Sequence, residues 1–143
     1  ISSLKKYARF GFINQHQEKK SANDFFNKLK INANSLNQNI TSLSGGNQQK
    51  AFLARIIAFD PQIMILDEPT IGIDVGAKYE IYALMDQLTK KGTSIILISS
   101  ELPEILGMSD RICVMRSGEI SGVFNRADAD QEVLLRAASH FDS

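Results

Sequence analysis

The sequence predicts an α/β fold in which a parallel sheet is flanked by helices. Two short apolar runs, residues 63–66 and 94–98, have the length and composition of buried parallel strands. Helical patterns alternate with these runs along the chain, as they do in proteins with parallel sheets. Ligands of such sheets bind beyond the carboxyl ends of the strands, where Asp67-Glu68 and Ser99-Ser100 fall. We therefore expect a functional site at these two strand ends.

The first part of the chain predicts a small helical unit. Residues 3–10 allow at most one helix, because apolar and basic residues are mixed there without a clear period, whereas residues 18–29 have a clear amphipathic pattern. Residues 32–41, rich in Asn and Ser, predict a polar connector. A further helix opens at Ser44-Gly45-Gly46, where a hydroxyl and two glycines predict a capped N-terminus. Its apolar side chains recur at helical spacing: Phe52, Leu53, Ile56 and Ile57.

The chain after Asp74 predicts helices and a strand pair. Residues 77–91 form a helix that Gly92 stops, and residues 102–108 form a short helix with a proline in its first turn. Residues 111–115 and 120–124 are predicted strands joined at Ser117-Gly118. Asp128 is expected to cap the closing helix. The side chains expected to point inward are Ile81, Leu84, Met85 and Leu88 in the first helix and Val133, Leu134, Ala137 and Phe141 in the last.

The composition is that of a globular protein, since 143 residues allow a sizeable core and 43% of them are apolar. The sequence has no signal-peptide pattern and no apolar run near the roughly 20 residues of a membrane span, so we expect any membrane role to go through a partner. Cys113 is the single cysteine, and we expect it to be buried as a small hydrophobe in a reducing compartment. Because the chain begins at Ile1, we expect it to be a piece of a longer protein.

The charges are unevenly distributed, although the net charge is zero. Residues 1–50 hold eight Lys or Arg against Glu18 and Asp24, which gives this part a net charge of +6. Such a surface would suit a nucleic acid. The basic residues are not interleaved with a recognisable nucleic-acid-binding motif, so a solvated face of the helical unit is favoured.

Two groups of residues carry the predicted chemistry. The helix start at Ser44-Gly45-Gly46 offers unpaired amide N–H groups and the positive end of a helix dipole, both of which attract anions. Asp67 and Glu68 end the first apolar run, where one carboxylate suits a Mg²⁺ ion and the second suits an attacking water that needs an orienting base. An anion-binding helix start followed by paired acids is the arrangement that phosphoryl transfer requires.

These residues resemble the motifs of one family. LSGGNQQK, ILDEPT and the GID turn are similar to the signature, Walker B and D-loop motifs of ABC-type ATPases, a class of P-loop NTPases. LSGGNQQK together with IDVGAK resembles the monosaccharide importers of the ribose, galactose and xylose group. The resemblance is strong from Ile40 to Phe124. It implies part of the helical subdomain, with the signature helix, over residues 1–58 and part of the RecA-like core over residues 59–143.

The resemblance also implies a role for each motif. Two ABC domains would sandwich two ATP molecules, so that the signature grips the γ-phosphate of the ATP seated on the partner domain. Paired acids would hold Mg²⁺ and orient the hydrolytic water at the domain's own ATP. The implied partners are membrane permease subunits and, through them, a sugar-binding protein, together with a second ABC domain in the same chain or in another copy. The protein itself would lie at the cytoplasmic side of the cell membrane. The candidate cofactor-binding residues are Ser44, Gly45, Gly46, Asn47 and Asp74, the metal ligand is Asp67, and the catalytic residues are Glu68 and Ser100.

The sequence departs from the family pattern in three places. A phosphate loop of the form GxxxxGK[ST] is absent from these 143 residues, which suggests a C-terminal piece of an ABC domain. Ser100 stands where ABC ATPases usually have a switch histidine, and serine supplies neither its reach nor its charge. A serine pair followed by glutamate at this place is typical of the second domain of the fused sugar importers. Ile71 replaces a common arginine, for which we have no physical account. His16 and His140 lie outside the motifs and are expected at the surface.

Three alternatives remain open at the level of sequence. An ABC-type ATPase of another process, such as translation or DNA repair, would share the three motifs. A regulatory domain could bind nucleotide without hydrolysing it, which Ser100 favours and Glu68 disfavours. A basic nucleic-acid-binding module would show salt-dependent binding of DNA or RNA.

Overall fold

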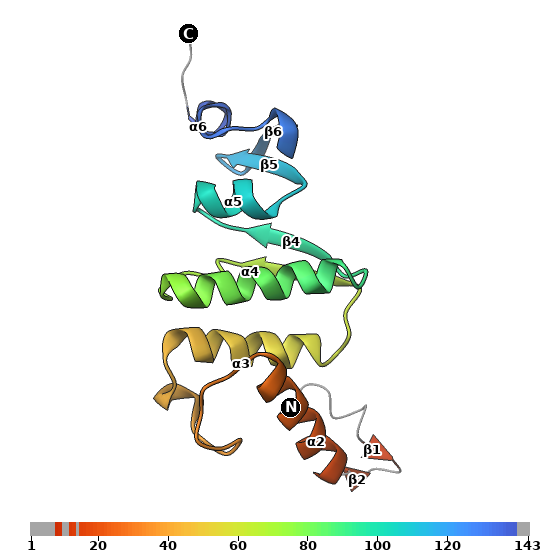
Figure 1. The fold of residues 1–143 in the computed structure, drawn as a ribbon. Coiled ribbons are helices and arrows are strands. Elements are labelled where there is room, and N and C mark those ends of the chain that lie inside the picture. The colour runs from red at the N-terminus through yellow and green to blue at the C-terminus, as the bar shows by residue number, and fades with distance from the viewer. Residues whose placement is uncertain (1–7, 10–11, 14, 140–143) are drawn as a thin grey trace. The chain divides into compact units, whose positions relative to one another are not determined.

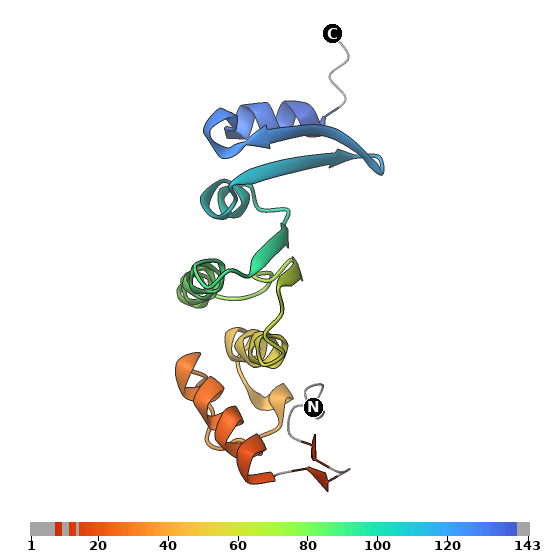
Figure 2. The same ribbon diagram turned by 90° about the vertical axis from the view of Figure 1, so that its right-hand side faces the viewer.

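The computed structural model describes residues 8–9, 12–13 and 15–139 (Figures 1 and 2). The chain divides into two compact units. The helical unit comprises Ile1–Ile65 and Pro69–Ile96, and the C-terminal unit comprises Leu66–Glu68 and Leu97–Ser143. The subdomain boundary expected after residue 58 stays a prediction.

The helical unit begins with a short antiparallel strand pair, β1 (Ala8–Arg9) and β2 (Phe12–Ile13). The helix predicted over residues 3–10 is therefore wrong for Ala8 and Arg9, and its other residues lie outside the described part. The stretch has no helical period, so pairing of Ala8 with Ile13 and of Arg9 with Phe12 takes precedence over helix formation. Helix α2 (Gln15–Lys28) follows, as the amphipathic pattern predicts.

A polar segment leads from α2 to the next helix. It contains the 3₁₀ turn η1 (Ile40–Ser42), which the side chain of Asn39 caps by accepting from the amide of Thr41. Helix α3 (Gly45–Ile57) buries one stripe of its surface, made up of Gly46, Lys50, Leu53 and Ile57. Phe52, which was expected in the apolar stripe, is about half exposed instead, since it lies off this face.

Helix α4 (Val75–Thr89) packs beside α3 within the helical unit (Figure 1). The four side chains predicted to point inward, Ile81, Leu84, Met85 and Leu88, are all buried. The helix begins two residues earlier than predicted, because the Asp74 carboxylate accepts a hydrogen bond from the amide of Ala77 at 2.9 Å and so caps it. Gly92, with a φ of +97°, follows the end of the helix, as expected of a C-terminal stop signal.

Strands β3 (Ile63–Asp67) and β4 (Ser94–Ile98) pair in parallel, which confirms the predicted sheet type. The amide of Ser94 donates to the carbonyl of Gln62 at one end of the pair, and the amide of Glu68 donates to the carbonyl of Ile98 at the other. The expectation that β3 is buried on both faces is wrong for this chain. Met64 and Leu66 are buried, but Ile63 and Ile65 are each 64% exposed, because the strand's side chains alternate and only one face is covered.

The C-terminal unit contains helix α5 (Leu102–Met108), the antiparallel strands β5 (Arg111–Arg116) and β6 (Glu119–Asn125), the 3₁₀ turn η2 (Arg126–Asp128) and helix α6 (Gln131–Ala138). Ser117 and Gly118 join the strands with φ angles of +50° and +85°, which suit a two-residue hairpin turn. Figure 2 shows α6 alongside this hairpin. The core comprises Ile112, Ala129 and Leu134, with Leu102, Ile105, Leu106, Val114 and Phe124 packed against it.

Three expectations for this unit need correction or lie beyond the described residues. Asp130 caps α6, accepting from the amide of Val133 at 2.8 Å, whereas Asp128 lies in η2. Cys113 is exposed, because its neighbours Ile112 and Val114 occupy the inner face of β5 and alternation turns the thiol outward. Phe141 and His140 lie outside the described residues. His16, in the helical unit, is exposed as expected.

Candidate nucleotide-binding site

The start of α3 differs from the predicted cap in one respect. Ser44 occupies the N-cap position with an extended backbone, but its hydroxyl caps no amide. It accepts a hydrogen bond from the side-chain amide of Asn47 at 2.8 Å instead. The helical ladder begins when the amide of Gln48 donates to the Ser44 carbonyl. The first amides of α3 have no acceptor within the helix, so the open donors that an anion requires are present.

The two glycines of this start are also needed for packing. A Cβ atom on Gly46 would lie 2.7 Å from the Cβ of Ala77, so α3 and α4 approach closely at this point. A Cβ on Gly45 would meet the carbonyl oxygen of Gly72 at 3.4 Å. The sequence interpretation assigned both glycines to phosphate approach. The structure adds that Gly46 is required by the helix contact itself.

Asp74 lies close to the helix start in the same unit. A Cβ placed on Gly46 would be 3.9 Å from the second carboxylate oxygen of Asp74. Both residues border a depression of about 300 Å³ that is lined by Ser44, Gly46, Asn47, Lys50, Asp74, Gly76, Ala77 and Glu80. Four of the five candidate residues of the helical unit, Ser44, Gly46, Asn47 and Asp74, thus lie around one depression.

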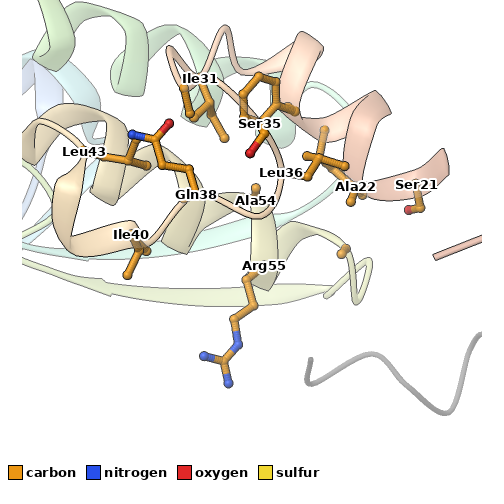
Figure 3. A pocket seen from close by; sticks show the side chains of 15 residues that line it. Ser21, Ala22, Ile31, Ser35, Leu36, Gln38, Ile40, Leu43, Ala54 and Arg55 are labelled. Carbon is orange, nitrogen blue, oxygen red and sulfur yellow. The ribbon is translucent and has the colours of Figure 1, made fainter. Parts of the chain in front are cut away.

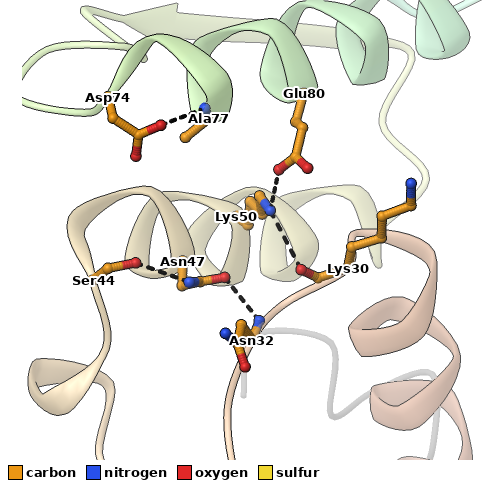
Figure 4. A network of polar contacts seen from close by, with 8 residues as sticks. All are labelled: Lys30, Asn32, Ser44, Asn47, Lys50, Asp74, Ala77 and Glu80. Carbon is orange, nitrogen blue, oxygen red and sulfur yellow. Dashed lines mark hydrogen bonds and ion pairs between the residues drawn. The ribbon is translucent and has the colours of Figure 1, made fainter.

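Lys50 is a residue of this region that the sequence reasoning missed. It is buried, forms an ion pair with Glu80 of α4 and donates to the carbonyl oxygen of Lys30 at 3.3 Å (Figure 4). Its charge is therefore neutralised inside the helical unit. The sequence does indicate that Lys50 is buried, because residues 46, 50, 53 and 57 follow helical spacing and place the lysine on the buried stripe.

A second hollow of the helical unit lies elsewhere and is apolar. This groove of about 540 Å³ runs between α2, residues 31–43 and α3, and the predicted site residues do not line it (Figure 3). Its lining includes Phe25, Phe26, Ile31, Leu36 and Ile40. Such a lining does not suit a phosphate group.

The acid pair stands at the end of β3 in the C-terminal unit. Asp67 is the last residue of the strand and is exposed. Glu68 follows with a φ of +46°, a left-handed conformation that costs a non-glycine residue about 1–3 kcal/mol and is often found at functional sites. Two contacts hold it there. Its amide donates to the carbonyl of Ile98 at 2.9 Å, and its carboxylate accepts from the amide of Ser100 at 2.8 Å.

The structure therefore joins two of the predicted catalytic residues directly. Glu68 and Ser100 meet through the backbone amide of Ser100, a contact that a residue of any type except proline could make. The side chain of Ser100 is exposed, and the hydroxyl of Ser99 instead accepts from the amide of Glu101 at 3.0 Å. Ser100 lacks the reach of the switch histidine that it replaces, but this does not affect the hydrogen bond that positions Glu68.

Neither a preformed metal cluster nor a membrane span is present among the described residues. No group of three or more His, Cys, Asp or Glu side chains in residues 8–9, 12–13 and 15–139 is placed to hold a metal ion. The helices in the same part of the chain are too short or too polar to cross a bilayer. A lone exposed carboxylate such as Asp67 is compatible with Mg²⁺, which often binds through one or two carboxylates plus substrate phosphates and water.

Comparison with known proteins agrees with this chemistry. The ABC transporter family model matches residues 3–71. A protein from Pseudomonas syringae pv. syringae, provisionally named a ribose/galactose/methyl galactoside import ATP-binding protein, is 52% identical over 97% of this chain and 26% of its own length. The xylose import ATP-binding protein XylG of Geobacillus kaustophilus is 48% identical over 97% of this chain and 28% of its length. Over nearly all of its length, this chain is similar to these ATP-binding proteins of ABC-type importers. It spans about a quarter of the length of these relatives.

Solved structures show the same fold. The ATP-binding cassette MJ0796, in a dimeric post-hydrolysis state bound to ADP and Pi, superposes with a TM-score of 0.71 at 22% identity. The match covers 82% of this chain and 51% of that one. The ABC ATPase fold predicted from the three motifs is therefore confirmed, and this chain holds part of it.

Proposed function

We propose that this chain is part of the ATP-binding subunit of a monosaccharide importer. In this role, ATP binding and hydrolysis drive sugar uptake through a membrane permease fed by a sugar-binding protein. The proposal is supported by relatives named for ribose, galactose and xylose import, about half identical to this chain over nearly all of its length. The subunit would lie on the cytoplasmic side of the membrane, attached through its permease.

The open amides at the start of α3 are proposed to bind the γ-phosphate of an ATP molecule seated on a second ABC domain. Ser44 is exposed, and the glycines beside it leave room for the phosphate to reach the backbone. Asp74 would lie at the seam between the two domains. Its carboxylate already caps α4, so a movement of Asp74 at the seam would alter the hydrogen bond at the start of that helix.

Glu68 is proposed to orient the hydrolytic water at this domain's own ATP, and its geometry is the observation that carries the proposal. Glu68 stands at the end of a parallel strand in a left-handed conformation, with its amide bonded to the Ile98 carbonyl and its carboxylate accepting from the Ser100 amide, and is thus preorganised for this task. Asp67 would hold Mg²⁺, which when bound neutralises charge on the phosphates. Ser100 cannot become a cation, so we expect slow hydrolysis at this site.

A regulatory domain that binds nucleotide without hydrolysis is the second candidate, and Ser100 is the observation that favours it. The test uses the longer subunit that contains this chain, reconstituted with permease and sugar-binding protein. We expect Mg-ATP-dependent uptake of ribose, galactose or xylose that Glu68→Gln reduces. Glu119→Gln, at an exposed hairpin position, is the matched control. ATPase activity stimulated by nucleic acid, but not by the permease, would contradict the importer proposal.

A further inference from the structure

Asn47 lies between the signature serine and the segment that follows α2 (Figure 4). Its amide nitrogen donates to the Ser44 hydroxyl at 2.8 Å, and its amide oxygen accepts from the backbone N–H of Asn32, also at 2.8 Å. Both ends of the side-chain amide are therefore engaged within the chain. This differs from the sequence-based interpretation, which placed Asn47 among the nucleotide ligands.

The chemistry of the partners fixes the direction of these hydrogen bonds. A backbone N–H can only donate, so the Asn47 atom facing Asn32 must be the amide oxygen. The amide nitrogen then faces Ser44 and can only donate, so the Ser44 hydroxyl is the acceptor. A hydroxyl that accepts still has its own hydrogen to donate. Within the described part of the chain, the structure shows no acceptor for that hydrogen, and Ser44 is exposed.

A second contact holds the same segment against α3. Lys50 lies one turn beyond Asn47 on the helix and donates to the carbonyl oxygen of Lys30, while its charge is paired with Glu80. Residues 30–32 are thus tied to α3 through a carbonyl and an amide. Asn47 is therefore held in place from two sides, and the Ser44 hydroxyl, which accepts from Asn47 and is exposed, keeps its own hydrogen to donate.

We propose that Asn47 is a positioning residue for the signature serine. It keeps the Ser44 hydroxyl as a donor to the bound phosphate and does not itself contact the nucleotide. This inference rests on the proposed function, because it requires that an anion binds at the start of α3. Asn47 then affects nucleotide affinity only by orienting the Ser44 hydroxyl.

The experiment is a double-mutant cycle on Mg-ATP affinity in the longer importer subunit, measured in a background in which both Glu68 and the equivalent glutamate of the other ABC domain are replaced by glutamine to prevent turnover. Ser44→Ala should weaken binding about tenfold or more, as expected for a lost hydrogen bond to a charged group. Asn47→Ala should weaken it less. The double variant should bind no more weakly than Ser44→Ala alone, since Asn47 has nothing left to position.

Two further variants separate positioning from general damage to the fold. Asn47→Asp still accepts from Asn32 but cannot donate to Ser44, so the hydroxyl would turn to the carboxylate and affinity should fall at least as far as in Asn47→Ala. Asn32→Ala keeps the backbone donor and should change affinity less than about twofold. Losses that multiply in the Ser44→Ala/Asn47→Ala variant would overturn the inference alone. No loss from Ser44→Ala would overturn both the inference and the phosphate role of α3.

Discussion

Gly46→Ala tests the closeness of α3 and α4. The added Cβ would lie 2.7 Å from the Cβ of Ala77, whereas two carbons in contact lie about 3.5–4.0 Å apart, so the helices would have to separate by about 1 Å. Overpacking of this kind costs about 1–3 kcal/mol. Alanine gains up to about 1 kcal/mol over glycine as a helix former. With the full propensity gain, we expect a net loss of about 0–2 kcal/mol in the free energy of unfolding.

The matched variant moves the methyl group from one helix to the other. Ala77→Gly should cost about 1 kcal/mol alone through helix propensity. Gly46→Ala/Ala77→Gly restores the room and should return stability to within about 0.5 kcal/mol of the parent chain. Gly45→Ala, whose Cβ would have an ordinary contact at 3.4 Å, is the control. Urea unfolding of the 143-residue chain, followed by circular dichroism, measures all four variants. Strictly additive effects of the two substitutions in the double variant would refute the close contact.

Other predictions concern the caps, the charges and the isolated chain. Asp130→Ala should lower stability by about 0.5–2 kcal/mol in the same assay and Asp128→Ala by less, because only Asp130 caps α6; equal effects would contradict this assignment. Burial and then the hydrogen bond and positive charge of Lys91 lower the pKa of Lys28 below its ordinary 10.5. At pH values between the lowered and the ordinary pKa of Lys28, the unfolded chain therefore binds more protons than the folded chain. The free energy of unfolding should rise with pH through that window. Lys28→Met should flatten the rise in alkaline urea titrations, whereas the exposed Lys20→Met should leave it unchanged. Titration calorimetry of the 143-residue chain with Mg-ATP should show at most weak binding, because the phosphate loop that cradles β- and γ-phosphates is absent from it; submicromolar affinity would mean that the nucleotide site is misplaced.

Local patterns predicted most of the elements because their signals are strong and short-range. The spacing of Ile81, Leu84, Met85 and Leu88 located the buried face of α4, and Ser117-Gly118 located the hairpin turn. The sequence does not show which of two nearby acids, Asp128 or Asp130, caps α6. The 3₁₀ turn η2 contains Asp128 and leaves Asp130 as the cap. Cys113 was misjudged because an apolar neighbourhood in sequence does not say which face of a strand is covered.

The site was predicted in its residues but only partly in its contacts. Motif spacing singled out Glu68, yet its left-handed backbone and its bond to the amide of Ser100 depend on pairing across 32 residues. The backbone partners of the Asn47 and Lys50 side chains likewise come from residues 30–32, a segment whose polar sequence gives no pairing signal. Sequence spacing identifies which groups carry the chemistry. The hydrogen bonds that orient them require the tertiary structure.

The central claim is that Glu68 is the base of a slow site whose switch position is Ser100. Steady-state ATPase activity of the longer subunit, reconstituted with permease and sugar-binding protein, tests it with Glu68→Gln and with the equivalent change in the other ABC domain. Loss of one transition-state contact commonly costs about 10²–10³-fold in rate, so most turnover should fall on the other domain's ATP. The account predicts a modest loss from Glu68→Gln and near abolition from the equivalent change. Equal losses from the two substitutions would contradict it.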